Sequence, residues 1–244
     1  MSDEENKDTK ISIGEIYDQL SAKAPSIPKK EVKVTEEIKE IGDTINENRV
    51  KDACIKVSGD IEYLRKLIFK MYPITAGLKA FKNDSVIYTD VALLKSAILS
   101  SISSENEKQL KADPYVIKNK FILPEPDVIC VEEHPKVAEL SKKYNVSKSV
   151  AGFMALKDDL KNSIIIIGKD EAALLLVCRL IERGIRPYLV LGFPAGPGAQ
   201  KNSKNYLAEA DLKIPLITMP DTKGGIEVAA ACFVELMKIF EEWE

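Results

Sequence analysis

Short apolar runs alternate with amphipathic stretches over most of the chain, as strands alternate with helices in an α/β fold. Four runs rich in Ile, Val and Leu are typical of strands that are buried on both faces of a parallel sheet. They cover residues 127–131, 163–167, 186–191 and 214–219. Helical periodicity covers residues 73–82, 91–101, 134–144, 150–160, 169–183, 201–210 and 225–242, and a further strand is expected over residues 85–89. We therefore predict a mostly parallel sheet with helices on both faces, a Rossmann-like three-layer arrangement.

The first 49 residues have a different pattern. Residues 1–10 are charged and carry too little apolar surface to order themselves, and a short amphipathic helix is expected over residues 11–20. Pro25 and Pro28 interrupt any helix there, and a charged helical pattern resumes over residues 35–48. We expect an N-terminal tail and helical arm over residues 1–49, attached to a single α/β domain over residues 50–244.

Composition excludes several classes of function. The 244 residues are 45% hydrophobic, enough for a substantial core. Lys and Arg total 35 against 38 Asp and Glu, so the net charge of −3 gives no electrostatic reason to expect nucleic acid or an anionic membrane as a partner. No apolar run approaches the roughly 20 residues that span a bilayer, and the polar N-terminus is unlike a signal peptide. We expect a cytoplasmic protein.

The metal-ligating residue types are sparse. The four cysteines are far apart in the sequence and none forms a C-x-x-C pair, so they are interpreted as buried thiols. His134 is the single histidine, which rules out a site built from several histidines, and it is expected to be a loop or cap residue. The sequence predicts no metal site.

Two glycine-rich turns in the last third of the chain are the best candidates for a binding site. One spans Gly192–Lys204 and the other Met219–Gly225, and each connects a predicted strand to a helix. Because ligands of open α/β sheets bind at the carboxyl ends of the strands, we expect the turns to lie side by side there and to line the largest polar cleft. Their backbone N–H groups, with Lys201, Lys204 and Lys223, suit a ligand rich in carboxylates. In the simpler interpretation the glycines only make tight turns and the lysines are solvated.

A nucleotide site is a weaker alternative. The segment Gly196-Pro-Gly-Ala-Gln-Lys201 begins like the dinucleotide motif G-x-G-x-x-G, and Asp221 follows the next strand, where a ribose-binding acid is expected. Lys201 stands where the third glycine is needed, and Pro197 stiffens the turn. The chain also has no match to the phosphate-binding pattern G-x-x-x-x-G-K-[ST].

The same turns resemble those of the precorrin-8X methylmutases of cobalamin biosynthesis. Residues 192–204 are similar to the family's loop G-x-P-V-G-F-V-x-A-x-E-S-K, and Thr222-Lys-Gly-Gly225 is similar to its R-K-G-G turn. Upstream, Ser147-Lys-Ser149 corresponds to T-R-S, residues 168–174 to G-N-A-P-T-A-L, and Thr89-Asp90 to a strand that ends in T-D. The resemblance extends from about residue 50 to the C-terminus.

The resemblance implies an isomerase that moves a methyl group from C-11 to C-12 of a corrin precursor without an organic cofactor. It also implies a tetrapyrrole ligand, precorrin or cobalt-precorrin, and a homodimer, for which the helices near residues 91–99 and 150–156 are candidate contacts. The substrate-binding residues implied are Ser58, Asp60, Asp90, Ser147, Lys148, Ser149, Gly192, Pro194, Gly196, Asn202, Ser203, Lys204, Lys223, Gly224 and Gly225.

The catalytic position differs from the family's motif. Family members protonate the ring with the histidine of I-H-x-x-G-D, and the matching segment here is Ile55-Lys-Val-Ser-Gly-Asp60, which places Lys56 at that position. Other changes are Lys148 for the arginine of T-R-S and Asn202 for the glutamate of E-S-K. Lysine releases its proton less readily than histidine at neutral pH unless burial lowers its pKa. Two hypotheses follow: Lys56 enters the cleft as the catalytic acid, or the chain is a non-catalytic corrin-binding protein in which Lys56 only holds a carboxylate.

Overall fold

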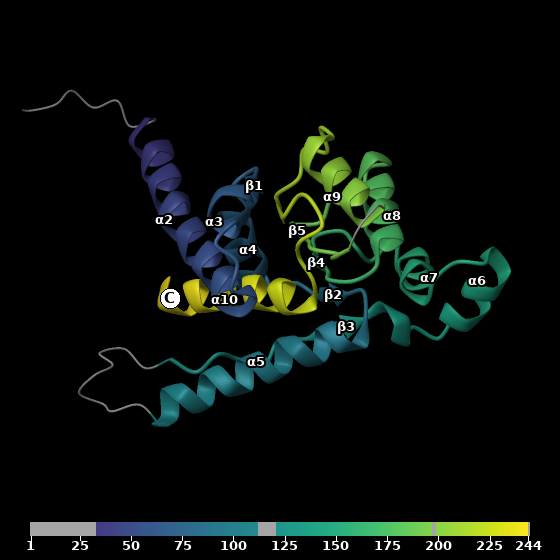
Figure 1. Ribbon diagram of the computed structural model, residues 1–244, viewed down its shortest axis with the longest axis horizontal. Coiled ribbons are helices and arrows are strands. Elements are labelled where there is room, and N and C mark those ends of the chain that lie inside the picture. The colour runs from purple at the N-terminus through teal and green to yellow at the C-terminus, as the bar shows by residue number, and fades with distance from the viewer. Residues whose placement is uncertain (1–32, 112–120, 197–198, 244) are drawn as a thin grey trace, which may run out of the picture. The chain divides into compact units, whose positions relative to one another are not determined.

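The computed structural model describes residues 33–111, 121–196 and 199–243 (Figure 1). A compact unit comprises residues 40–244, and the fold is described for this unit. The tail and the helix that the sequence predicts over residues 11–20 lie outside the described residues. Helix α2 (Lys33–Ser58) runs without a break across residue 49, where we placed the boundary of the domain. That boundary stays a prediction.

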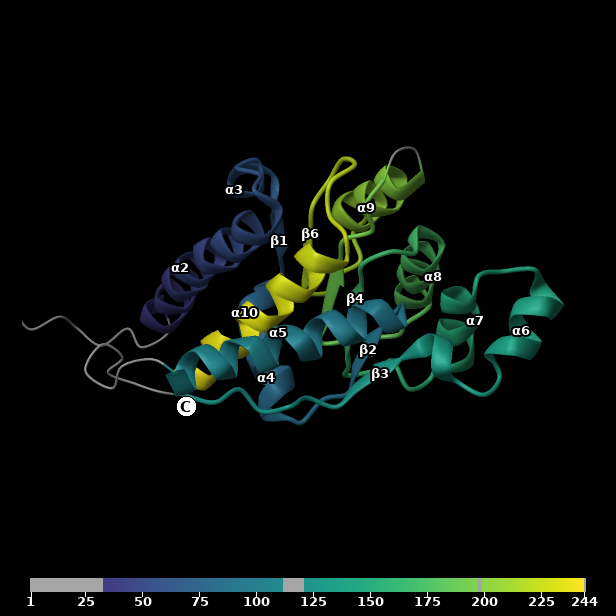
Figure 2. The ribbon, with the colours of Figure 1, turned by 60° about the horizontal axis from the view of Figure 1, so that its bottom comes forward.

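Six strands in the described residues form one sheet, in the order β1-β6-β5-β4-β2-β3. Figure 2 labels all of them except β5. They are β1 (Ile68–Lys70), β2 (Ile87–Thr89), β3 (Val128–Cys130), β4 (Ile164–Ile167), β5 (Leu189–Gly192) and β6 (Leu216–Thr218). Every neighbouring pair from β6 to β3 is parallel, and β1 pairs antiparallel with β6 at the edge. The predicted mostly parallel sheet is confirmed.

The described helices follow the strands along the chain in the predicted alternation. Helix α4 has the predicted bounds, and the others differ from them at their ends. They are α3 (Tyr63–Lys66), α4 (Pro73–Lys82), α5 (Ala92–Lys111), α6 (Val137–Tyr144), α7 (Lys148–Ala155), α8 (Glu171–Glu182), α9 (Ala199–Glu209) and α10 (Ile226–Trp243), with a short 3-10 helix η1 (Val131–Glu133). No helix in the described part of the chain is both long and apolar enough to cross a membrane.

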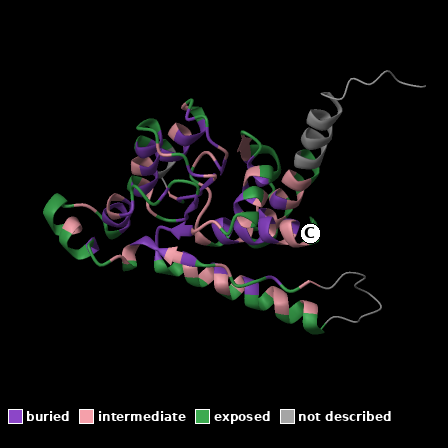
Figure 3. Ribbon diagram, turned by 180° about the vertical axis from the view of Figure 1, so that it is seen from behind, coloured by how far each residue is buried: buried purple, intermediate pink, exposed green. Residues whose placement is uncertain are grey.

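The strands bury side chains on both faces, which divides the core into two clusters (Figure 3). In β4, Ile164 and Ile166 belong to one cluster and Ile165 and Ile167 to the other, as the pleat of a strand requires. Helices α4, α5 and α10 supply side chains to the first cluster, and α7, α8 and α9 supply them to the second. The sheet is thus the middle of three layers, as predicted.

Three features of the fold differ from the sequence-based expectation. Helix α2 continues to Ser58, beyond the predicted end at residue 48, and α5 continues to Lys111, beyond the predicted end at residue 101. The polar half of α5 is held by long-range partners, because Glu105 pairs with Lys238 of α10 and the Asn106 side chain exchanges hydrogen bonds of 2.8 and 2.9 Å with the backbone of Leu123. The edge strand β1 was not predicted. Its three residues are all half-buried, so buried and exposed positions do not alternate along it.

Candidate active site

The two glycine-rich turns lie side by side at the carboxyl edge of the sheet, because β5 and β6 are parallel neighbours. Two backbone hydrogen bonds join them. The Gly196 N–H donates to the Thr222 carbonyl at 3.0 Å, and the Gly225 N–H donates to the Phe193 carbonyl at 2.6 Å. The sequence-based placement of these turns is confirmed.

Gly224 is required at the point where the turns meet. Its φ of +137° lies in the region that favours glycine, and a Cβ added there would overlap the Phe193 carbonyl oxygen. Gly225 follows with a φ of +108° and leads directly into α10. This close approach of backbone to backbone fixes the shape of the turn.

The turns border a cleft of ≈ 650 Å³. Its remaining walls come from the turn after β4, the start of α10, the first turns of α5 and the end of α2. The lining includes the backbone of Gly224 and Gly225, the polar side chains of Ser58, Lys169 and Glu227, and apolar residues that include Val57 and Leu93. The cleft thus combines apolar lining residues with few charged groups, as small-molecule sites do.

Lys56 lies next to this cleft, in a second hollow of ≈ 570 Å³ between α2, α5 and α10. Val57 contributes to both hollows. The exposed Lys56 shares the second one with Ser100, Ser101 and Ser104 of α5. We expected Lys56 to reach the cleft between the turns, and the structure instead gives that position to Val57 and Ser58.

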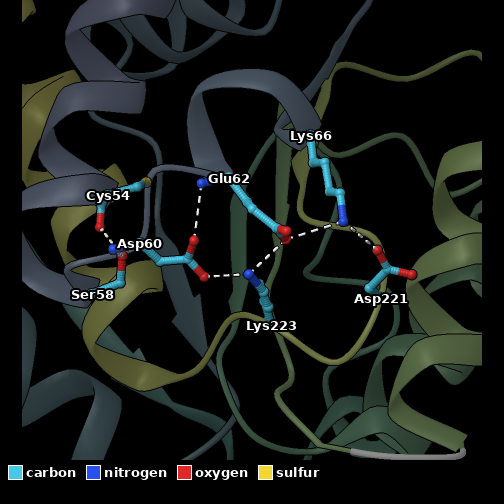
Figure 4. A network of polar contacts seen from close by, with 7 residues as sticks. All are labelled: Cys54, Ser58, Asp60, Glu62, Lys66, Asp221 and Lys223. Atoms are coloured by element: carbon cyan, nitrogen blue, oxygen red, sulfur yellow. Dashed lines mark hydrogen bonds and ion pairs between the residues drawn. The ribbon is translucent and has the colours of Figure 1, made fainter.

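Lys223 is held by protein carboxylates (Figure 4). Its ammonium group contacts Asp60 and, at 2.6 Å, Glu62, while Lys66 contacts Glu62 at 3.0 Å and Asp221 at 3.3 Å. This network ties the turn after β6 to the segment that follows α2. The hydrogen bond from Lys223 lowers the pKa of Asp60 and of Glu62, and the same contacts raise the pKa of Lys223. These ion pairs hold Lys223 against the segment that follows α2 and so stabilise the turn.

Lys204 lies beneath the same turn and has no exposed surface. Its ammonium group donates a hydrogen bond to the backbone carbonyl of Lys223. Burial lowers the pKa of Lys204 to about 8, although the charge of Asp221 opposes the shift. Lys204 thus holds the backbone of Lys223, which is next to Gly224 in the lining of the cleft. Its neighbour Ser203 is also buried, and Asn202 is exposed.

Gly192 and Pro194 shape the first turn from within. Both are buried, and a Cβ on Gly192 would overlap the Leu207 side chain of α9. The Gly192 carbonyl accepts a hydrogen bond of 2.6 Å from the Thr218 hydroxyl, which joins β5 to β6 at their ends. These residues position the turn, while Ala195 lines the cleft among the described residues of this loop.

Asp90 is fully buried and fixes the turn after β4. Its carboxylate accepts backbone N–H bonds from Gly168 at 3.2 Å, from Lys169 at 2.8 Å and from Asp170 at 2.8 Å. Burial raises the pKa of the Asp90 carboxyl group, and the three N–H donors act in the opposite direction. The carboxylate is engaged by three backbone donors, so its contribution to the cleft is the position of Lys169.

The segment Ser147–Ser149 begins α7 and lies outside the lining of the cleft. The Ser147 hydroxyl caps α7 and donates a hydrogen bond of 2.5 Å to Asp170, the residue that caps α8. Ser149 is buried and donates to Glu132 at 3.0 Å, and Lys148 is exposed. The segment therefore supports the turn after β4 through Asp170.

Of the residues expected at the site, the structure brings Ser58, Gly224 and Gly225 to the cleft. Lys169, Ala195 and Glu227 line it as well and were not singled out from the sequence. A signal existed for Lys169, since it is the second residue after a buried strand, at the edge where ligands bind. Glu227 lies in the first turn of α10, and its sequence pattern alone does not distinguish it from an ordinary first-turn acid.

Comparison with known proteins gives a consistent result. The model of the precorrin-8X methylmutase family matches residues 32–239. The cobalt-precorrin-8 methylmutase of Methanocaldococcus jannaschii is 33% identical over 205 residues, which cover 81% of this chain and 85% of that protein. The cobalt-precorrin-8 methylmutase of Leptospira interrogans is 29% identical over 192 residues, 75% of this chain and 78% of that protein. A crystal structure of precorrin-8x methyl mutase from Thermus thermophilus has the same fold, with a TM-score of 0.64 at 23% identity over 86% of this chain and 98% of that one.

Proposed function

Because this chain belongs to the precorrin-8X methylmutase family, we propose that it is a methylmutase of cobalamin biosynthesis that moves a methyl group from C-11 to C-12 of a precorrin or cobalt-precorrin. The observation that carries the proposal is the cleft itself. Its walls include the two turns whose sequences match the family's loops, at the carboxyl edge of the sheet. The family match and the hollow surface thus coincide at one place in the fold.

The cleft suits a large, partly apolar ring with acidic side chains. Val57 and Leu93 offer exposed apolar surface to a ring, and the glycine turns bring backbone close to it. The hollow that contains Lys56 adjoins the cleft at Val57 and offers an ammonium group and serine hydroxyls. We propose that the tetrapyrrole lies across both hollows, with its ring over the cleft.

The reaction requires a proton that is lent and returned. Substrate and product of a methyl shift are isomers, so an acid that protonates the ring must recover its proton before the next cycle. We propose Lys56 for this role, because it stands at the position of the family's histidine. Its side chain is exposed in the free protein, so the role requires that the bound ring cover it and exclude water.

We also propose that the protein is a homodimer. The support is the family and the exposed Leu93 on α5, a leucine with 65% exposure at the rim of the cleft. Helix α7, the other candidate contact, already packs Val150 and Phe153 into the core of its own chain. A cytoplasmic location remains a prediction from the sequence.

The proposed activity is tested by incubating purified protein with cobalt-precorrin-8 and following the visible absorption spectrum over time. We expect a spectral change on mixing, from binding, and then a slower catalytic change to the isomer. Heat-denatured protein is the control. Binding without turnover would identify a corrin-binding protein instead, and the absence of both would overturn the proposal.

A further inference from the structure

We propose that Lys169 is the residue that binds a carboxylate of the tetrapyrrole in the cleft and so orients the ring. This inference rests on the proposed function, because it names the contact that the ligand makes. It follows from the partners of each cationic side chain near the two turns. The backbone around Lys169 and the chemistry of its neighbours then supply independent support.

Two of the lysines expected at the site, Lys204 and Lys223, are already engaged, and so is the neighbouring Lys66, while the Lys201 side chain lies outside the described residues. Lys223 contacts Asp60 and Glu62, and Lys66 contacts Glu62 and Asp221. Lys204 is fully buried and donates to a backbone carbonyl. An ammonium group that is saturated by protein acceptors gains little from a ligand carboxylate, since one ion pair would replace another.

Lys169 differs from these lysines, because it is neither buried nor paired with an acceptor among the described residues. Among the described residues that line the cleft it is the cationic one, and its side chain is exposed. Within the described part of the chain its ammonium group has no ion pair or hydrogen bond. A ligand carboxylate would therefore meet a cation that no protein carboxylate neutralises, which makes a charge-assisted hydrogen bond favourable.

The backbone of Lys169 is held in place before the ligand arrives. Its N–H group donates to the buried Asp90 carboxylate at 2.8 Å, and the flanking Gly168 and Asp170 donate to the same carboxylate. Only the side chain has to be ordered on binding, so no cost of ordering the backbone is added to that of the side chain. The buried Asp90 thus acts as a positioning residue for Lys169.

The other polar groups of the cleft do not compete for the carboxylate. The Ser58 hydroxyl donates to the Cys54 carbonyl at 2.8 Å and accepts from the Asp60 N–H at 3.2 Å. Glu227 is an acid and repels a carboxylate. An acidic side chain of the ring is therefore directed to Lys169, and the edge of the ring near Glu227 must be uncharged or a hydrogen-bond donor.

The test is an absorption titration of the full chain with cobyrinic acid and with its fully methyl-esterified form, which has the same ring without the charges. Lys169→Met should weaken binding of the acid about tenfold or more, the loss expected for one charge-assisted contact. It should leave binding of the ester unchanged, and Lys169→Arg should restore most of the affinity for the acid. Lys161→Met is the matched control, because this exposed lysine lies before the opposite end of the same strand, β4.

Three outcomes separate the hypotheses. The inference is supported if Lys169→Met loses affinity for the acid and the control Lys161→Met does not. Equal affinity of wild type and Lys169→Met for the acid overturns it while the proposed function stands, provided that the wild type binds and converts cobalt-precorrin-8. A wild type that binds neither corrin and converts no substrate overturns the proposed function, and the inference with it.

Discussion

Lys56 occupies the position at which the family motif I-H-x-x-G-D has its histidine. The side chain is exposed, so Lys56→Ala should fold normally. If Lys56 is the acid, this substitution should lower kcat on the order of 100-fold or more, the usual contribution of a general acid. Lys56→His should keep turnover near neutral pH, because histidine titrates there.

Steady-state kinetics of the three proteins distinguish the two roles of Lys56. A carboxylate anchor would raise KM and leave kcat nearly unchanged, since it holds substrate and transition state alike. Wild-type kcat and KM in Lys56→Ala would rule out both roles. The distinction cannot be made from the sequence, because the motif fixes which residue stands there and not what covers it.

Lys204 should make stability depend on pH. Its pKa is about 8 in the folded protein against an ordinary value of 10.5, so the unfolded chain binds more protons between these two values. The contribution of Lys204 to the free energy of unfolding should therefore be least favourable below pH 8 and should rise from pH 8 to about 10.5. The cause is the cost of burying an ammonium group, which disappears when the proton leaves.

Urea unfolding at several pH values from 7 to 10 measures this effect, with Lys204→Met as the reference. The difference in free energy of unfolding, wild type minus variant, should grow in favour of the wild type across that range. A difference that is constant with pH would show that Lys204 has an ordinary pKa in the folded protein.

Single residues also show what the sequence could not reveal. Lys223 was expected to bind a ligand, and it is instead paired with Asp60, which is 163 positions away in the chain. No local pattern signals a contact of that separation. Asp90 was expected at the binding site because Thr89-Asp90 corresponds to the family's strand that ends in T-D. Its role as an acceptor for three backbone N–H groups is seen only in the folded chain.

At the scale of elements, the turn at Gly224 is the most sensitive joint of the site. Gly224→Ala combines an unfavourable φ of +137° with overlap of the Phe193 carbonyl oxygen. We expect a loss of about 2–4 kcal/mol in the free energy of unfolding, because strain and overlap add. Corrin affinity should fall too, since the residue lines the cleft.

Gly184→Ala is the matched control for this prediction. Gly184 has a φ of +105°, and an added Cβ would meet nothing within 4 Å. It should therefore show the cost of the backbone conformation alone, about 1–3 kcal/mol, with corrin binding unchanged. Equal losses in the two variants, measured by urea unfolding, would show that the contact with Phe193 contributes nothing.

Elements with strong periodicity were predictable, and those held by distant partners were not. The parallel strands β4 and β5 are continuous apolar runs, and the sequence located both to within a few residues. The last turns of α5 are polar apart from the exposed Leu110, and the pairing of Glu105 with Lys238 holds them against α10. Strand β1 pairs with β6, which lies some 150 residues further along the chain, so its three residues alone gave no signal.

For the molecule as a whole, the sequence predicted the fold well because local pattern and topology agree. Alternating strands and helices allow few arrangements when crossovers are right-handed, and the two turns then had to meet at one edge. The position of α2 was less predictable. Its last residues form one wall of the cleft only because the helix packs Val50 and Cys54 into the core beside α10.

The assembly state is the remaining prediction at this scale. We expect light scattering at micromolar concentration to give twice the chain mass of 27.1 kDa. Leu93 is 65% exposed near the start of α5, and a leucine that is buried between two subunits would not tolerate a charge. Leu93→Lys should therefore shift the protein to the monomer.

Leu110→Lys is its control, because Leu110 is 69% exposed at the far end of the same helix. A wild type that scatters as a monomer would contradict the dimer. A dimeric Leu93→Lys would move the contact away from Leu93, and the cleft beside it would then face solvent rather than a second subunit.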